Sequence, residues 1–166
     1  MYYEDIFKAL QERRVKYLVV GGVAMGLHGI PRMTADLDIM LDLTPANIKK
    51  FIAATGKIGY VPRPPLTLGD FLDQRKRKSW AEEKNMVMFT LINPKIPYQE
   101  LDVFVENPMD FKELYAGKKI AQFGNIEIPV ASMDGLIALK EKTGRRQDKA
   151  DISILKRLIK NGSKEE

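Results

Sequence analysis

Residues 17–42 read YLVVGGVAMGLHGIPRMTADLDIMLD, and this stretch decides which fold we expect of the chain. Its first four residues predict a buried strand, Gly21-Gly22 interrupts that strand, and a short helix follows. In the next predicted strand Asp36 and Asp38 alternate with apolar residues, so both carboxylates point to one face. Neighbouring carboxylates repel each other unless a cation lies between them, and glycine lets a backbone approach a phosphate closely. The stretch therefore predicts a site for a metal ion beside a phosphate.

The rest of the chain continues this alternation of strands and helices. Apolar periodicity predicts helices at 3–14, 23–28, 44–57, 67–75, 109–115 and 133–142, and a last amphipathic helix around 152–159. Strand patterns lie at 17–20, 36–41, 86–92, 100–105, 119–123 and 126–130, and the last four pair into two hairpins. We expect an irregular connector at 59–65, a loop or helix start at 143–149 and a frayed tail at 161–166.

Length and composition exclude several classes of protein. A chain of 166 residues with 45% apolar residues fits one domain, and we expect it to be cytoplasmic because it has neither a signal-peptide pattern nor an apolar run of roughly 18–20 residues. The absence of cysteine excludes disulfides, thiolate zinc sites and cysteine nucleophiles. The single histidine, His28, excludes a two-histidine metal site. A net charge of +5 suits an anionic partner such as a nucleotide or RNA, although many proteins without one share it.

A third carboxylate strengthens the prediction of a metal site. Asp102 lies inside Leu101-Asp102-Val103-Phe104, an otherwise apolar strand in which an unpaired acid is unfavourable. The ordinary alternative for Asp36 and Asp38 is a surface strand with alternating acids. That alternative does not account for the Gly-Gly turn, for the apolar second face of the strand or for the third acid, so we favour a carboxylate cluster.

With these features the sequence resembles the nucleotidyltransferase superfamily that includes DNA polymerase β. Its pattern of a Gly-Gly or Gly-Ser turn, an acid-x-acid strand and a third acid on a later strand matches Gly21-Gly22, Asp36-Leu37-Asp38 and Asp102. Residues 21–41 and the C-terminal KEKTGRRQDKADISIL are similar to small prokaryotic members, including the AbiEii-like toxin group. The resemblance implies an α/β (α+β) fold with a small mixed sheet and helices packed mainly on one side. It implies one domain over 1–166, with C-terminal helices (about 132–160) packed on it.

The resemblance also implies roles for these residues. Asp36 and Asp38 would hold two Mg²⁺ ions, and Asp102 would bind the ion at the nucleophile and serve as general base. Gly21 and Gly22 would approach the β- and γ-phosphates of a nucleoside triphosphate. The activity implied is transfer of a nucleoside monophosphate to a hydroxyl, with pyrophosphate as the leaving group.

Further polar residues have both a functional and an ordinary interpretation. Arg32 and Thr34 match polar positions before the acidic strand, where Arg32 either binds nucleotide phosphate or orients Asp36, or is an ordinary loop arginine. We expect His28 to be a helix-end or packing residue. The basic run 75–78 beside Trp80 could follow an RNA backbone with an aromatic stacking site, but we favour an exposed helix end.

Four charged residues near the C-terminus are also open to two interpretations. Lys140 and Arg145 are candidates for binding triphosphate or acceptor, and Asp148 and Asp151 for orienting them. The alternative is a solvated helix terminus with pairs of opposite charge one turn apart.

The acceptor is the least determined part of the functional prediction. The toxin-like resemblance and the basic charge favour tRNA or a partner protein, and suggest the toxin of a toxin–antitoxin pair with an antitoxin partner. A small-molecule acceptor stays open, although a chain of this length has little beyond the core from which to build a second substrate pocket. The rival hypothesis is a nucleotide-binding or protein-interaction module that kept the fold without turnover. No membrane partner is expected, and the oligomeric state is left open.

Overall fold

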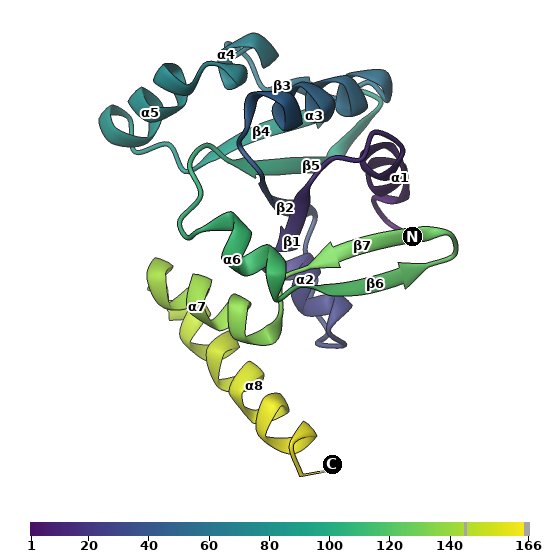
Figure 1. Cartoon of the computed structure of the whole chain (residues 1–166), viewed down its shortest axis with the longest axis vertical. Helices are drawn as coiled ribbons and strands as arrows, with labels where there is room; N and C mark the ends of the chain where they lie inside the picture. The colour runs from purple at the N-terminus through teal and green to yellow at the C-terminus, as the bar shows by residue number, and fades with distance from the viewer. Residues whose placement is uncertain (145, 165–166) are drawn as a thin grey trace.

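A seven-stranded mixed sheet in the order β3-β4-β5-β2-β1-β7-β6 organises the computed structural model, which describes residues 1–144 and 146–164 (Figure 1). The strands are β1 (Tyr17–Val20), β2 (Asp36–Leu41), β3 (Val61–Pro62), β4 (Met88–Asn93), β5 (Ile96–Phe104), β6 (Lys119–Phe123) and β7 (Ile126–Val130). The helices are α1 (Glu4–Glu12), α2 (Gly21–Leu27), α3 (Pro45–Lys57), α4 (Leu68–Leu72), α5 (Gln74–Glu83), α6 (Phe111–Ala116), α7 (Met133–Thr143) and α8 (Arg146–Gly162).

The register of the central strands gathers the acidic residues on one face. β1 pairs antiparallel with β2, which places Val20 opposite Asp38. β2 pairs parallel with β5, so Asp36 lies opposite Glu100 and Asp38 lies opposite Asp102. Directly paired residues project from the same side of a sheet. The two strands therefore present four carboxylates on a single face.

The opposite face of these strands holds the main core. Leu37 and Ile39 are fully buried there, and helices α1, α3, α4 and α5 cover them. Phe71 of α4 lies 6.2 Å from Phe51 of α3 and 4.8 Å from Phe89 of β4, measured between ring centroids. Burial of this apolar surface is what holds the helices on the sheet. The expected mixed sheet with helices mainly on one side is confirmed.

The acidic face is covered only in part. α2 packs on β1 and β2, while Leu136 and Leu139 of α7 approach Val20 at the end of β1. α8 packs on α7, and Figure 1 shows both helices projecting from the lower end of the sheet. The carboxylates stay partly exposed near the C-terminal end of β1.

Most predicted elements agree with the structure, and four segments differ. β5 begins at Ile96, four residues before the predicted start of its strand. Residues 59–65 contain the short strand β3, which pairs with β4, where an irregular connector was expected. The helix predicted at 67–75 is two helices, because the Asp73 side chain accepts hydrogen bonds from the amides of Arg75 and Lys76 and so starts α5. At the C-terminus α8 continues to Gly162, beyond the expected start of the frayed tail.

The basic run 75–78 lies at the N-terminal end of α5, and Arg75, Lys76 and Lys78 are exposed, as expected of an exposed helix end. Arg77 is buried and donates a hydrogen bond to the Phe71 carbonyl oxygen. Trp80 is also buried and stacks on Phe89, 5.7 Å away between ring centroids. Its indole is therefore a core group, and the idea that it stacks on a nucleic-acid base is wrong.

Candidate functional site

Carboxylates from the central strands β2 and β5 form a close cluster on the partly covered face of the sheet. Oxygen atoms of Asp36, Glu100 and Asp102 lie within 4.8 Å of one another, a spacing that one cation can bridge. Thr90 on β4 donates a hydrogen bond from Oγ1 to Asp102 Oδ1, 2.5 Å away, and Arg63 forms an ion pair with Glu100. Each neighbour fixes the direction in which its carboxylate points.

The surroundings of Asp102 disfavour its ionised form, and a bound cation would favour it. Burial raises the pKa of Asp102 above its usual value, and the negative charges of Asp36 and Glu100 raise it further. The hydrogen bond from Thr90 and the charge of Arg63 act in the opposite direction on the same pKa. A divalent cation among these oxygens would offset both the burial and the repulsion, and oxygen-only ligands are the set that Mg²⁺ prefers. The residues present therefore fit a magnesium site.

Gly21 is packed directly against the Asp38 carboxylate. Its φ is +68°, and a Cβ built on it would lie 2.2 Å from Asp38 Oδ2. Only glycine meets both conditions, because other residues rarely adopt this φ and any side chain would displace the carboxylate. The Gly-Gly turn therefore has a definite purpose: it brings the backbone that starts α2 onto one of the acids.

Gly22 sets the second close contact of the turn. A Cβ on Gly22 would lie 3.1 Å from the Thr34 side chain. Thr34 Oγ1 in turn donates to the Asp36 carbonyl oxygen at 3.2 Å and accepts from the Asp36 amide at 3.4 Å. Thr34 thus joins the turn to the first residue of β2, which is a structural role next to the cluster.

A buried ion network joins the loop before β2 to the C-terminal helices. Asp151 on α8 is 1% exposed and accepts two hydrogen bonds from Arg32, at 2.5 and 2.8 Å. It also accepts one from Lys140 Nζ at 2.9 Å, and Asp148 lies 3.7 Å from the same ammonium group. The interpretation of Lys140, Asp148 and Asp151 as a solvated helix terminus is therefore wrong. Arg32 pairs with Asp151, which identifies it as a link between distant segments.

Lys140 also faces the acidic face. A cleft of about 70 Å³ is lined by Gly21, Asp38, Lys140 and Asp148, together with apolar side chains of β1, β4, β5 and α7. It has room for phosphate groups and not for a whole nucleoside. An ammonium group opposite a glycine turn and a carboxylate is an arrangement that suits a metal-bound phosphate.

Several sequence predictions meet at this place. Asp36 and Asp102 share one cluster, Asp38 lies beside it under the Gly-Gly turn, and Lys140 faces the turn across the cleft. Arg145 lies outside the described residues.

His28 and Glu100 are two further polar residues near the site. His28 ends α2 and its Nε2 lies 2.7 Å from the Ala131 carbonyl oxygen, as expected of a helix-end residue. Glu100 was missed, although Glu100-Leu101-Asp102 repeats the acid-x-acid spacing of β2 and that repetition was a usable signal.

The comparisons with known proteins concern the fold. Neither a protein-family model nor a curated protein sequence matches the chain. None of the described helices is long and apolar enough to cross a membrane.

Solved structures do match the chain over most of its length. A nucleotidyltransferase candidate from Thermotoga maritima, TM1012, matches with a TM-score of 0.56 and 17% identity, covering 94% of this chain and 89% of its own. The lincosamide antibiotic adenylyltransferase LnuA, bound to lincomycin, matches at 0.57 and 18%, covering 91% and 92%. ANT(2″)-Ia in complex with adenylyl-2″-tobramycin matches at 0.58 and 13%, covering 93% and 86%. The chain has the fold of these nucleotidyltransferases.

Proposed function

We propose that the protein is a divalent-metal-dependent nucleotidyltransferase that moves a nucleoside monophosphate from a nucleoside triphosphate to a hydroxyl group. One observation carries the proposal: the carboxylates of Asp36, Glu100 and Asp102 converge from two different strands, and Asp38, which the Gly21 backbone touches, lies opposite Asp102 on the same face. A shared fold alone supports no particular chemistry. The proposal rests on this fold together with the convergence of the acids.

We assign Asp36, Asp38 and Asp102 to two Mg²⁺ ions and Glu100 to the outer part of the same cluster. Bound there, the ions would lower the pKa of the attacking hydroxyl and offset charge that develops on the phosphoryl group. The reaction forms a bond from the acceptor oxygen to the α-phosphorus and breaks the bond from that phosphorus to the β-phosphate oxygen. Pyrophosphate leaves and the hydroxyl proton goes to a carboxylate.

Asp102 is the carboxylate best placed to take that proton. Thr90 holds its Oδ1 so that the other oxygen can face the acceptor. Lys140 is placed to bind the phosphates in the cleft beside Gly21 and Gly22. Asp148 and Asp151 position the Lys140 ammonium group. Asp151 also holds Arg32, and Thr34 holds the backbone of Asp36.

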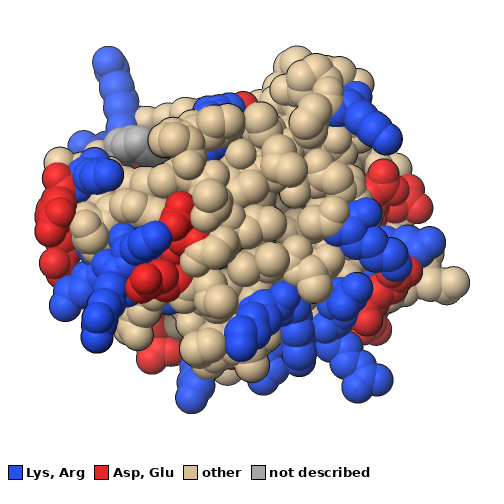
Figure 2. Space-filling model, turned by 90° about the horizontal axis from the view of Figure 1, so that it is seen from above, with Lys and Arg blue, Asp and Glu red and all other residues tan. Residues whose placement is uncertain are grey.

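The identity of the acceptor is a separate matter. LnuA and ANT(2″)-Ia were solved with lincomycin and with adenylyl-2″-tobramycin, which are small molecules. Figure 2 views the molecule from the side of α3, α4 and α5, and the Lys and Arg side chains on it are spread around the rim with acidic ones between them. This dispersed charge gives little support to an RNA-binding surface there. The tRNA or protein acceptor, the toxin role and the antitoxin partner stay predictions from the sequence.

The test is transfer of label from each α-³²P nucleoside triphosphate, with Mg²⁺, to the components of a cell extract. We expect the wild type to label an acceptor, and Asp102→Asn to reduce labelling by at least about 100-fold. Glu127→Gln is the matched control because Glu127 is an exposed acid on β7 of the same sheet. Equal labelling by wild type and Asp102→Asn would refute the proposal. Nucleotide binding without any transfer would favour a binding module.

A further inference from the structure

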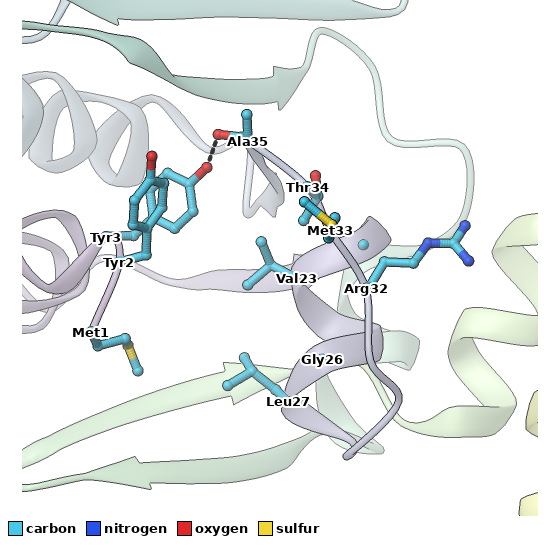
Figure 3. Close-up of a pocket in the computed structure, with 11 residues that line it drawn as sticks. Met1, Tyr2, Tyr3, Val23, Gly26, Leu27, Arg32, Met33, Thr34 and Ala35 are labelled. Atoms are coloured by element: carbon cyan, nitrogen blue, oxygen red, sulfur yellow. Dashed lines mark hydrogen bonds between the residues drawn. The ribbon is translucent and has the colours of Figure 1, made fainter.

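A cavity of about 650 Å³ is lined by Gly22, whereas the cleft with Lys140 is lined by Gly21, so the two hollows flank the Gly-Gly turn. It is open to solvent, and three segments border it: the N-terminal residues, one side of α2 and the loop before β2 (Figure 3). Its lining residues are Met1, Tyr2, Tyr3, Gly22, Val23, Gly26, Leu27, Arg32, Met33, Thr34 and Ala35. Cavities of roughly 300–1,000 Å³ are the size of small-molecule sites. The chain thus builds the second pocket that its length made unexpected.

The cavity is apolar, and its apolar side chains are left open to solvent. Met1, Tyr2 and Met33 are 45%, 51% and 103% exposed, and all three line it. Arg32 is the only arginine or lysine among the lining residues, and Figure 3 shows its guanidinium directed away from the cavity towards the C-terminal helices, where Asp151 binds it. Exposed apolar side chains gathered around a concave site are typical of ligand binding.

The position of the cavity connects it to the reaction centre. Thr34 lines it and is hydrogen-bonded to the backbone of Asp36. The Tyr3 hydroxyl donates a hydrogen bond to the Ala35 carbonyl oxygen, the residue before Asp36 (Figure 3). Burial raises the pKa of Tyr3, and the negative charge of Asp36 adds to this, which places the two side chains within electrostatic reach. A ligand in the cavity would therefore lie next to the first acid of β2.

The two hollows differ in the charge they offer. Lys140 lines the cleft beside Gly21 and Asp38, with its ammonium group paired to Asp151 and Asp148, so this lysine together with metal ions on the acids would receive the anionic triphosphate on that side. The cavity beside Gly22 offers aromatic and aliphatic surface together with tyrosine and threonine hydroxyls. A nucleobase would fill only a small part of it. Asp38 lines the cleft, and Asp36 directly follows Ala35, which lines the cavity, so β2 joins the two hollows where a phosphoryl group would pass from donor to acceptor.

We propose that this cavity binds the acceptor, and that the acceptor is a small, largely apolar molecule that carries a hydroxyl group. The inference rests on the proposed nucleotidyltransferase function and adds the class of substrate. An RNA or a polycationic sugar would find few complementary charges in an apolar cavity, whereas an uncharged aromatic or aliphatic body would bury its surface there. Its hydroxyl would face Asp36 and Asp102.

Gly26 offers a way to fill the cavity without disturbing the fold. It lies within α2, lines the cavity, and a Cβ built on it meets no heavy atom within 4 Å. Gly26→Leu therefore projects a side chain into the cavity and replaces a poor helix former with a good one. Gly56→Leu is the matched control, because Gly56 lies within α3, is exposed and also meets nothing within 4 Å. Met33→Asp, at a fully exposed residue, is a second variant that leaves packing intact.

The binding arm of the test uses prodan, an uncharged naphthalene dye whose emission shifts to the blue in apolar surroundings. We expect wild type and Gly56→Leu to bind it alike, and Gly26→Leu and Met33→Asp to raise its dissociation constant at least about tenfold. ATP with Mg²⁺ should leave prodan bound. Equal binding by Gly26→Leu, or displacement of prodan by ATP, would overturn the inference, the second because the cavity would then hold the nucleotide.

The transfer arm identifies the acceptor class. A cell extract is separated by ultrafiltration into small-molecule and macromolecular fractions, and each is incubated with α-³²P nucleotide and Mg²⁺. We expect label in the small-molecule fraction with wild type and Gly56→Leu, and a loss of at least about tenfold with Gly26→Leu. Label confined to macromolecules, at equal levels with both glycine variants, contradicts the inference. If Gly26→Leu loses prodan but no fraction is ever labelled, the failure lies in the nucleotidyltransferase function, and the cavity stands as a ligand site with no acceptor role.

Discussion

Replacing Gly21 with alanine should disable the site with a predictable pattern of damage. The added Cβ would lie 2.2 Å from Asp38 Oδ2, so the carboxylate must move by about 1.5 Å to reach an ordinary van der Waals separation. A displacement of that size at a reacting centre costs on the order of 100-fold in rate. The φ of +68° adds a backbone penalty of about 1–2 kcal/mol, which lowers the free energy of unfolding.

A second glycine separates these two effects. Gly124 has a φ of +57° in the β6–β7 hairpin, and a Cβ on it would meet nothing within 4 Å. Gly124→Ala should therefore lower the free energy of unfolding in urea by the same backbone penalty and keep full transfer activity. Gly21→Ala should lose both stability and about 100-fold of the labelling rate per folded molecule. If Gly21→Ala labels acceptor as fast as Gly124→Ala, the contact between the turn and Asp38 has no catalytic importance.

Three further variants test the surroundings of the site. Asp151→Ala should lower the free energy of unfolding by about 3 kcal/mol, because the partly buried Arg32 and Lys140 both lose a partner. Glu141→Ala, which breaks an exposed pair with Lys156, should change that free energy by less than about 0.5 kcal/mol. Urea denaturation measures both. The raised pKa of Asp102 means that the folded state binds its proton more tightly than the unfolded state, so the ionised carboxylate lowers the stability of the fold above that pKa. In EDTA, Asp102→Asn should therefore be more stable than wild type near pH 8, and the difference should vanish near pH 3. A constant difference across that range would contradict the assigned environment. Glu100→Gln should keep transfer within about tenfold of wild type, because we place it at the rim of the cluster; a loss as deep as that of Asp102→Asn in the labelling assay would make it a primary metal ligand.

The sequence carries enough information to predict the strands of the site. The alternation of Asp36 and Asp38 with apolar residues determines both the strand and the face, since a period of two leaves no other arrangement. Asp102 stands out because an acid in an apolar strand needs a partner. The parallel pairing that puts Asp102 opposite Asp38 is a long-range contact that the sequence did not predict; the family resemblance predicted only that Asp102 joins the other two acids.

Other features depend on tertiary contacts that local patterns do not encode. The ion pair between Arg32 and Asp151 spans 119 positions, so nothing near either residue indicates it. The charged neighbours of Trp80 left open an exposed stacking site, but α5 directs its indole onto Phe89 in the core. The cavity at Gly26 forms where the N-terminus passes α2, which no window of sequence contains.

The proposal depends on whether the carboxylates of β2 and β5 bind divalent cations together. Mn²⁺ titration followed by electron paramagnetic resonance, with a non-hydrolysable ATP analogue present, measures this without knowledge of the acceptor. We expect two bound ions per wild-type molecule, and a loss of at least one in Asp36→Asn and in Asp102→Asn. Wild-type Mn²⁺ binding by Asp102→Asn would contradict the assignment, because β5 would then take no part in holding the metal.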